Sequence, residues 1–189
     1  AIQQVPRART PVRLPVVLSR EEVGRLLNAL TGVPWIIVAL LYGAGLRLQD
    51  GIELRVKDVD FDLNQIVLRR GKGQKDRRTM LPAAVRERLR AHLAEVKQQH
   101  ERDLVAGVGR AVLPFALDRK YQAASTEWKW QFVFPAVRIC RNRRWGPPSR
   151  FHLHESVVQK AMAAAARAAG ITKLLGPHSM RYYAGSRTM

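Results

Sequence analysis

The sequence Gly43-Ala44-Gly45-Leu46-Arg47-Leu48-Gln49-Asp50 joins an apolar segment to a charged one. The preceding run, Trp35 to Tyr42, has no polar face, so it is predicted to form a helix buried on all sides. Two glycines end that helix and let the backbone approach its neighbours closely. Arg47 then opens a third helix that reaches about Leu54. The stretch therefore predicts an arginine held at a helix start, with the carboxylate of Asp50 three positions further on.

The chain before this stretch divides into a linker and a first helix. Residues 1–18 carry three prolines among several arginines, which is typical of an extended basic linker that follows another domain. Ser19-Arg20-Glu21-Glu22 has the pattern of a helix capping box. Apolar residues then follow at helical spacing, namely Val23, Leu26, Leu27 and Leu30. We therefore expect the folded domain to span residues 19–189.

Beyond the third helix the periodicity changes to that of strands. Gln65 to Arg69 and Arg77 to Leu81 have strand composition, and Gly71-Lys72-Gly73 between them is typical of a turn. Pro82 sits where a helix would start, and that helix is expected to reach about Leu104. Its inward stripe is predicted to be Val85, Leu89, Leu93 and Val96.

The remaining chain contains an aromatic insertion followed by helices. The insertion, residues 107–150, holds three of the four tryptophans. An alanine-rich helix is expected from about Glu155 to Ala169, where Gly170 stops it, and Pro177 opens a further helix. The predicted fold class is α+β, mostly helical with a small antiparallel β-hairpin or sheet.

The charge balance indicates a polyanionic partner. The 189 residues include 33 lysines and arginines against 15 aspartates and glutamates, which gives a net charge of +18. Such a field attracts nucleic acid, with a merely solvated basic surface as the alternative. Cys140 is the single cysteine, so it excludes an internal disulfide and a cysteine-based zinc site, and it fits a reducing cytoplasm. The longest apolar run, Val33 to Leu41, is too short to span a bilayer.

Three separated pieces carry the candidate chemistry: Gly43 to Asp50, Gly71 to Arg77, and His178-Ser179-Met180-Arg181. Each piece alone has an ordinary explanation, as a structural arginine, a solvated hairpin lysine and a common helix start. In this order, within a strongly basic chain, the pieces resemble the tyrosine recombinase (phage integrase) family. The resemblance extends over about residues 15–183.

The resemblance implies an active site built around one scissile DNA phosphate. Arg47 and Arg181 would clamp its non-bridging oxygens, because guanidinium is always charged and binds phosphate bidentately. His178 would bind the same phosphate and help to move the nucleophile's proton, and Lys72 would protonate the departing 5′ oxygen. Asp50 would orient and support the site. A tyrosine would attack to give a 3′-phosphotyrosine link, so no cofactor, metal or ATP is expected.

The nucleophilic tyrosine of the family lies on a later helix than the one that carries Arg181. Tyr182 and Tyr183 follow Arg181 directly and cannot both face the phosphate that it faces. We therefore expect the chain as given to lack its nucleophile and not to cut DNA. A fragment of a recombinase and a non-catalytic basic DNA-binding module derived from one are the two alternatives.

The amino-acid sequence of the insertion indicates one branch of the family. Leu113 to Tyr121, Glu127 to Pro135 and His152-Leu153-His154-Glu155 resemble the corresponding segments of integron integrases. The resemblance implies integration of gene cassettes by recognition of a folded single DNA strand, partly through extruded bases. It also implies a duplex integration site as a second DNA partner, a homotetramer on DNA, and a place in the bacterial cytoplasm at the nucleoid.

Unpaired bases stack on aromatic faces, which gives a set of candidate contacts. Those contacts are Trp130, Pro148 and His152, with Trp128 as an alternate. The competing interpretation is a small satellite core under the insertion, and it is favoured for Trp128, Phe132 and Phe134, whose alternate spacing predicts one buried face. Lys75 and Arg77 are further candidate DNA contacts. Basic residues expected to face the phosphate backbone or solvent are Arg138, Arg141, Arg143 and Arg144.

Overall fold

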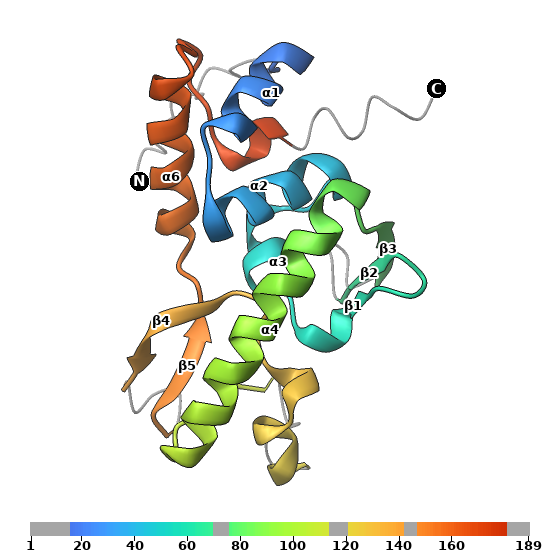
Figure 1. The fold of residues 1–189 in the computed structure, drawn as a ribbon, viewed down its shortest axis with the longest axis vertical. Coiled ribbons are helices and arrows are strands. Elements are labelled where there is room, and N and C mark those ends of the chain that lie inside the picture. Colours follow the sequence, from blue (N-terminus) through green and yellow to red (C-terminus); the bar gives the residue numbers. More distant parts are fainter. Residues whose placement is uncertain (1–15, 70–75, 114–120, 142–146, 181–189) are drawn as a thin grey trace, which may run out of the picture.

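The computed structural model describes residues 16–69, 76–113, 121–141 and 147–180 (Figure 1). Its helices are α1 (Arg20–Asn28), α2 (Gly32–Ala44), α3 (Leu48–Ile52), α4 (Ala83–Val105) and α6 (Glu155–Ala168), with 3-10 turns η1 (Val56–Asp58), η2 (Gln122–Thr126) and η3 (Trp128–Trp130). Its strands are β1 (Val59–Asp60), β2 (Gln65–Leu68), β3 (Arg77–Met80), β4 (Pro135–Cys140) and β5 (Ser149–His152). Helices with small antiparallel sheets confirm the predicted α+β fold class.

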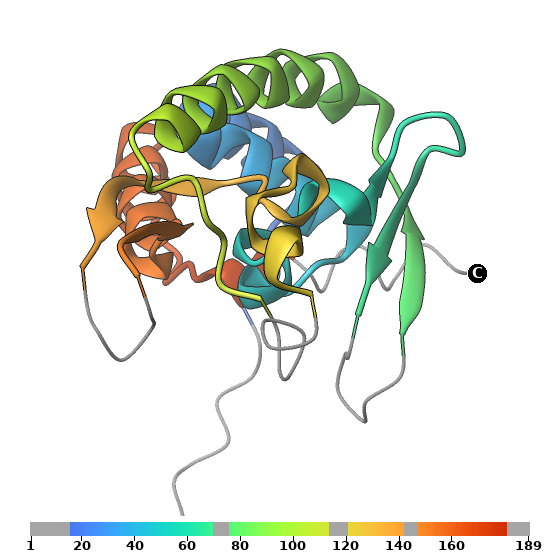
Figure 2. The same ribbon diagram turned by 90° about the horizontal axis from the view of Figure 1, so that it is seen from below.

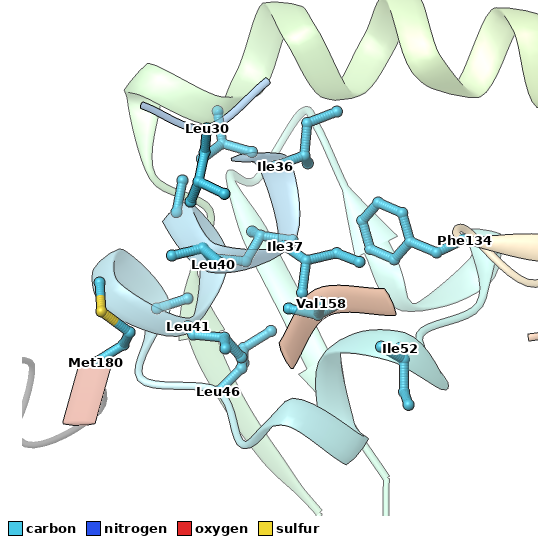
Figure 3. Packing of buried hydrophobic residues seen from close by; sticks show 14 of the residues in the cluster. Leu30, Ile36, Ile37, Leu40, Leu41, Leu46, Ile52, Phe134, Val158 and Met180 are labelled. Carbon is cyan, nitrogen blue, oxygen red and sulfur yellow. The ribbon is translucent and has the colours of Figure 1, made fainter. Parts of the chain in front are cut away.

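Helix α2 forms the centre of the core. Its residues from Ile36 to Leu41 are all buried, as expected of a helix without a polar face. Helices α1, α3, α4 and α6 pack around it, and Figure 3 shows Leu40 and Leu41 within the resulting cluster. The helix begins earlier than the sequence predicted, at Gly32. Pro34 is tolerated there because N–H groups in the first turn have no partner within the helix.

Helices α1 and α6 lie side by side against α2. The predicted capping box of α1 is confirmed, because Ser19 Oγ accepts the Glu22 N–H at 3.2 Å and the Glu22 carboxylate accepts the Ser19 N–H at 2.6 Å. Gly170, just after α6, takes a left-handed conformation (φ 65°), as a helix stop requires. Leu18 is already 2% exposed, so the folded body includes the end of the segment expected to be a linker.

Helix α4 crosses the molecule between two sheets (Figures 1 and 2). It starts directly after Pro82, as predicted. Its predicted inward stripe is confirmed, since Val85, Leu89, Leu93 and Val96 are all buried. Within the described part of the chain, no helix combines the length and the apolar character needed to cross a membrane.

The first sheet has the order β1-β2-β3 and is antiparallel throughout. Strands β2 and β3 are the predicted pair, in a register that places Gln65 opposite Met80 and Leu68 opposite Arg77. The short strand β1 was not predicted, since two residues are too few to show a period. The pairing of Leu68 with Arg77 brings the two ends of the predicted hairpin turn together.

The second sheet belongs to the insertion and was not predicted. Strands β4 and β5 pair antiparallel with a bulge, and segment 121–134 lies between the two sheets (Figure 2). The predicted burial of Phe132 and Phe134 is confirmed, but the predicted alternation is not, because Gln131 and Val133 are buried as well. One reason is an isolated β-bridge from Arg55 to Phe132, which covers the segment from the α3 side. Phe134 joins the main core and not a satellite cluster.

Candidate functional site

Arg47 stands at a turn that the backbone fixes from both sides. Gly45 ends α2 in the left-handed conformation (φ 64°), which glycine adopts without a steric penalty. Arg47 is the N-terminal cap of α3, and the Asp50 carboxylate accepts its backbone N–H at 3.3 Å. The carboxylate thereby satisfies one N–H group that a helix start leaves without a partner. Asp50 thus orients the turn that carries Arg47.

Strand β3 locks the same turn from the opposite direction. The carbonyls at the end of α2 lack partners within the helix. Thr79 Oγ1 donates to the Ala44 carbonyl at 2.9 Å, and Arg77 Nη2 donates to the Gly45 carbonyl at 3.3 Å. Arg77 Nη2 also lies 3.5 Å from Asp50 Oδ2. Arg77, a candidate DNA contact, therefore links the hairpin to the Arg47 turn.

His178 lies at the start of a helical turn, residues 177–180, and its side chain is exposed. Two residues later, Met180 is fully buried in the same cluster as Leu41 and Leu46 (Figure 3). Leu46 directly precedes Arg47, so the core anchors both turns through neighbouring side chains. Several candidates lie outside the described residues: Lys72, Lys75, Arg143, Arg144, Arg181, Tyr182 and Tyr183.

A cleft of about 900 Å³ extends from Asp50 toward the insertion. Trp130 and His152, two of the candidate base contacts, both line it, and both are partly buried. Pro148, the third, is exposed and is not among the described residues that line the cleft. His152 lies four positions further along extended chain, which places it about 13 Å from Pro148. Trp128 packs instead against the core and His100, at 5.9 Å between ring centroids.

Aromatic rings and cations are interleaved along the cleft. Lys57 Nζ lies 4.7 Å from the ring centroid of Trp130, so one face of the indole is covered by an ammonium group. The His152 ring lies 4.3 Å from that of Phe151 and 5.4 Å from that of Phe132. This combination of flat rings and cations suits a planar aromatic ligand.

The acidic groups of the cleft have basic neighbours, although His152 is charged only when it is protonated. Every acidic side chain among the described lining residues lies within 4.0 Å of a basic nitrogen. The pairs are Asp50 with Arg77, Glu53 with His152, Asp58 with Lys57 and Arg69, and Asp76 with Arg69. Paired charges leave little net attraction for a phosphate, so the cleft favours a neutral ligand.

Sequence reasoning missed Arg55 and Lys57, which shape this cleft. Arg55 donates hydrogen bonds to the carbonyls of Trp130 and Val112, which are 75 and 57 residues away. No local pattern marks contacts at such separations. The signal that was available is the polar character of residues 55–58, which follow a helix. Ordinary loops commonly have the same character.

Comparison with known proteins identifies a matching family and several similar sequences. The profile of the Phage integrase family matches residues 17–189. An integrase/recombinase of Escherichia coli is 40% identical over 181 residues, which cover 96% of this chain and 54% of that protein. Tyrosine recombinase XerA of Thermococcus kodakarensis is 42% identical over 100 residues, which cover 51% of this chain and 36% of that protein. The chain spans about half the length of the Escherichia coli relative.

Solved structures share the fold. A crystal structure of XerA recombinase superposes with a TM-score of 0.60 at 22% identity, covering 96% of this chain and 52% of that one. XerH recombinase, bound to its difH substrate before cleavage, superposes with a TM-score of 0.58 at 19% identity, covering 94% of this chain and 44% of that one. At such identities the agreement concerns the fold alone. The match over residues 17–189 shows that this chain belongs to the phage integrase family.

Proposed function

We propose that this chain provides the phosphate-binding and base-recognising parts of a site-specific DNA recombinase that integrates gene cassettes, as integron integrases do. The relatives named integrase/recombinase and tyrosine recombinase support the general activity. XerH, which shares the fold, was solved with its DNA substrate, which supports DNA as the partner. The net charge of +18 supports the same partner.

The proposed chemistry centres on the turn that carries Arg47. Its guanidinium and that of Arg181 clamp the scissile phosphate, and preorganised donors of this kind stabilise the charge that develops during transfer. His178 hydrogen-bonds to the phosphate, and Lys72 protonates the departing 5′ oxygen. A nucleophilic tyrosine forms the 3′-phosphotyrosine link, which conserves the bond energy for rejoining. Asp50 holds the Arg47 turn in place.

The cleft between Asp50 and the insertion is the observation that carries the cassette-site proposal. It extends from Asp50, in the turn that carries Arg47, to Trp130 and His152, and its acidic groups have basic neighbours. A base extruded from a folded single strand is neutral and flat, and stacking it on an aromatic ring contributes about 1–3 kcal/mol. Arg138 and Arg141 are exposed and do not line the cleft, and in this proposal such arginines face the phosphate backbone or solvent.

The test compares hairpins of one folded strand with and without extrahelical bases. We expect the chain to bind the bulged hairpin more tightly than the matched perfect hairpin in a gel-shift titration. Trp130→Ala should reduce that preference by about fivefold or more, since the lower limit of a stacking contact is about 1 kcal/mol. Trp130→Phe retains a ring and should keep most of the preference. Equal loss of affinity for both hairpins in Trp130→Ala would contradict base stacking.

A second experiment separates a recombinase from a non-catalytic DNA-binding module. In a protein that joins this domain to a nucleophilic tyrosine, cassette-end DNA should yield a covalent adduct that survives denaturing electrophoresis. Arg47→Ala should abolish the adduct while it retains most of the binding, because phosphate contacts elsewhere supply much of the affinity. Absence of any adduct with the unaltered protein would favour the binding module.

A further inference from the structure

Arg55 lines the cleft and hydrogen-bonds to two distant points of the chain on either side of one part of the insertion. Its Nη1 donates to the Trp130 carbonyl at 2.6 Å and its Nη2 to the Val112 carbonyl at 2.7 Å. These carbonyls belong to segments that enter and leave η2 and η3, the turns that present Trp130. A single planar guanidinium therefore closes this part of the insertion with two donors held in a fixed fork, whereas a lysine presents its donors from one rotatable nitrogen.

The backbone on both sides of Arg55 holds the same part of the insertion. The Val56 N–H donates to the Gln131 carbonyl at 3.0 Å, and the Val133 N–H donates to the Leu54 carbonyl at 2.8 Å. The Arg55 guanidinium also lies 4.4 Å from the ring centroid of Phe132, over its face. Trp130 is thus fixed by its own carbonyl and by the residues that follow it.

Arg55 is also held on the side of the cleft that carries Arg47. It lies three residues beyond the end of α3, the helix that Arg47 opens, and its backbone N–H is accepted by the Asp58 carboxylate at 3.3 Å. Asp58 is buried and also pairs with Lys57, whose ammonium covers the Trp130 ring. The distance between the catalytic turn and the indole is therefore set through Arg55 and its two neighbours.

We propose that Arg55 is a positioning residue for the extrahelical base, and that its guanidinium sets the orientation of Trp130 on which selectivity for bulged DNA depends. The inference rests on the base-recognition function proposed above and names the residue that makes that function possible. Arg55 acts through Trp130 and does not contact the scissile phosphate. A purely structural arginine would instead lower stability and weaken the binding of all DNA equally.

The experiment uses the 189-residue chain and a hairpin with 2-aminopurine at the extrahelical position, whose fluorescence is quenched when the base stacks. Arg55→Gln removes the grip on both carbonyls. We expect the preference for the bulged hairpin over the perfect one to fall by about fivefold, and the quenching to be lost. Affinity for the perfect hairpin should stay within about twofold, because the phosphate contacts lie elsewhere.

Arg86→Gln is the matched control. Arg86 is also a partly buried arginine that donates to a backbone carbonyl, that of Phe61, at 2.9 Å. It lies on α4 and is not among the described residues that line the cleft. We expect Arg86→Gln to leave both the preference and the quenching unchanged, even where it lowers the unfolding temperature.

The outcomes separate the inference from the function on which it rests. If the unaltered chain shows no preference for the bulged hairpin, the proposed base recognition fails. If the unaltered chain is selective and a folded Arg55→Gln variant is equally selective, or loses affinity for both hairpins alike, the positioning role of Arg55 is wrong. Should Arg55→Gln not fold, Arg55→Lys decides, because lysine keeps the charge but lacks the fixed planar fork of the guanidinium. Full selectivity in that variant overturns the inference.

Discussion

Two glycines at the end of α2 act in different ways. Gly45 supplies a left-handed conformation, whereas Gly43 supplies space. A Cβ at residue 43 would lie 2.6 Å from Cγ and 2.9 Å from Cβ of Pro82, which is closer than carbon atoms approach. Pro82 is the cap of α4, so this contact fixes where α4 leaves the core. The sequence predicted close approach here without naming the partner.

Gly43→Ala should therefore destabilise the fold. Overpacking of a tight contact costs about 1–3 kcal/mol, and the proline ring cannot rotate away. The free energy of unfolding from urea titration measures the effect. Gly24→Ala is the control, because nothing lies within 4 Å of a Cβ at that exposed position in α1. It should stabilise by up to about 1 kcal/mol through helix propensity. Equal effects of the two substitutions would show that Pro82 does not constrain the turn.

The inward face of helix α4 is apolar along its first part and polar toward its end. Its first turns bury an apolar stripe against the core, and the stripe then continues in buried polar residues, His100 and Asp103. His92 Nε2 donates to the Val133 carbonyl at 2.8 Å, and His100 Nε2 donates to the Thr126 carbonyl at 3.0 Å. Irregular backbone needs such donors when it is buried. Helix α4 therefore serves as the scaffold on which the insertion rests.

The last anchor of α4 is an ion pair with β5. Arg150 Nε lies 2.6 Å from Asp103 Oδ2, and both side chains are largely buried. Burial raises the pKa of Asp103, but hydrogen bonds from Arg150 and Gln99 outweigh it, so the pKa lies below its ordinary value. Arg150→Met should destabilise by about 3–5 kcal/mol, because it leaves a buried carboxylate unpaired.

A matched control for the Arg150 substitution lies within the insertion. Lys129 pairs with Glu127 at 2.6 Å, but both groups are well exposed. Lys129→Met should change the unfolding free energy by less than about 1 kcal/mol, as surface pairs do. Chemical denaturation of the two variants compares them directly. A loss below about 1 kcal/mol in Arg150→Met would mean that β5 is not anchored through α4.

The two histidines of α4 predict a loss of stability in mild acid. Burial lowers the pKa of both His92 and His100 from the ordinary 6.5, against the smaller opposing effect of their carbonyl partners. Below about pH 6.5 these two histidines bind more protons in the unfolded chain than in the folded one. The free energy of unfolding therefore falls as the pH decreases. Each histidine contributes at most about 1.4 kcal/mol per pH unit.

Urea titrations between about pH 7.5 and pH 5.5 measure this dependence, in a window above the titration of Asp103. The double variant His92→Gln with His100→Gln keeps a side-chain donor at each site but cannot take up a proton. Its stability should vary less with pH than that of the unaltered chain. The same slope in both proteins would assign the acid sensitivity to other groups.

The predictability of these elements follows the range of the interactions that form them. Helices α1 and α2 were predictable because their signals, a capping box and an apolar run, lie within one or two turns of chain. The register of β4 and β5 was not, because the strands are short and bulged. The turn that carries Arg47 could be inferred from Gly43 to Asp50, whereas the cleft depends on contacts such as Arg55 to Trp130. Packing across the fold decides those contacts, and no local period encodes them.

On the scale of the whole molecule, the charge of the chain as a whole differs from the charge of the cleft. The chain carries a net charge of +18, yet the acidic groups that line the cleft are paired there. The excess positive charge therefore lies outside the cleft. The proposed function then combines two kinds of contact with DNA: phosphate contacts, which release counterions, and a stacked base, which releases none.

This division predicts how salt acts on binding. The affinity for both the bulged and the perfect hairpin should fall with the same slope between about 50 and 200 mM salt, because the same phosphates are contacted. The ratio of the two dissociation constants should stay constant, since it reports only the base in the charge-paired cleft. Parallel gel-shift titrations at several salt concentrations measure both quantities. A ratio that shrinks as salt rises would mean that a phosphate occupies the cleft, and with it that Trp130 and His152 recognise the backbone of the strand and not an extruded base.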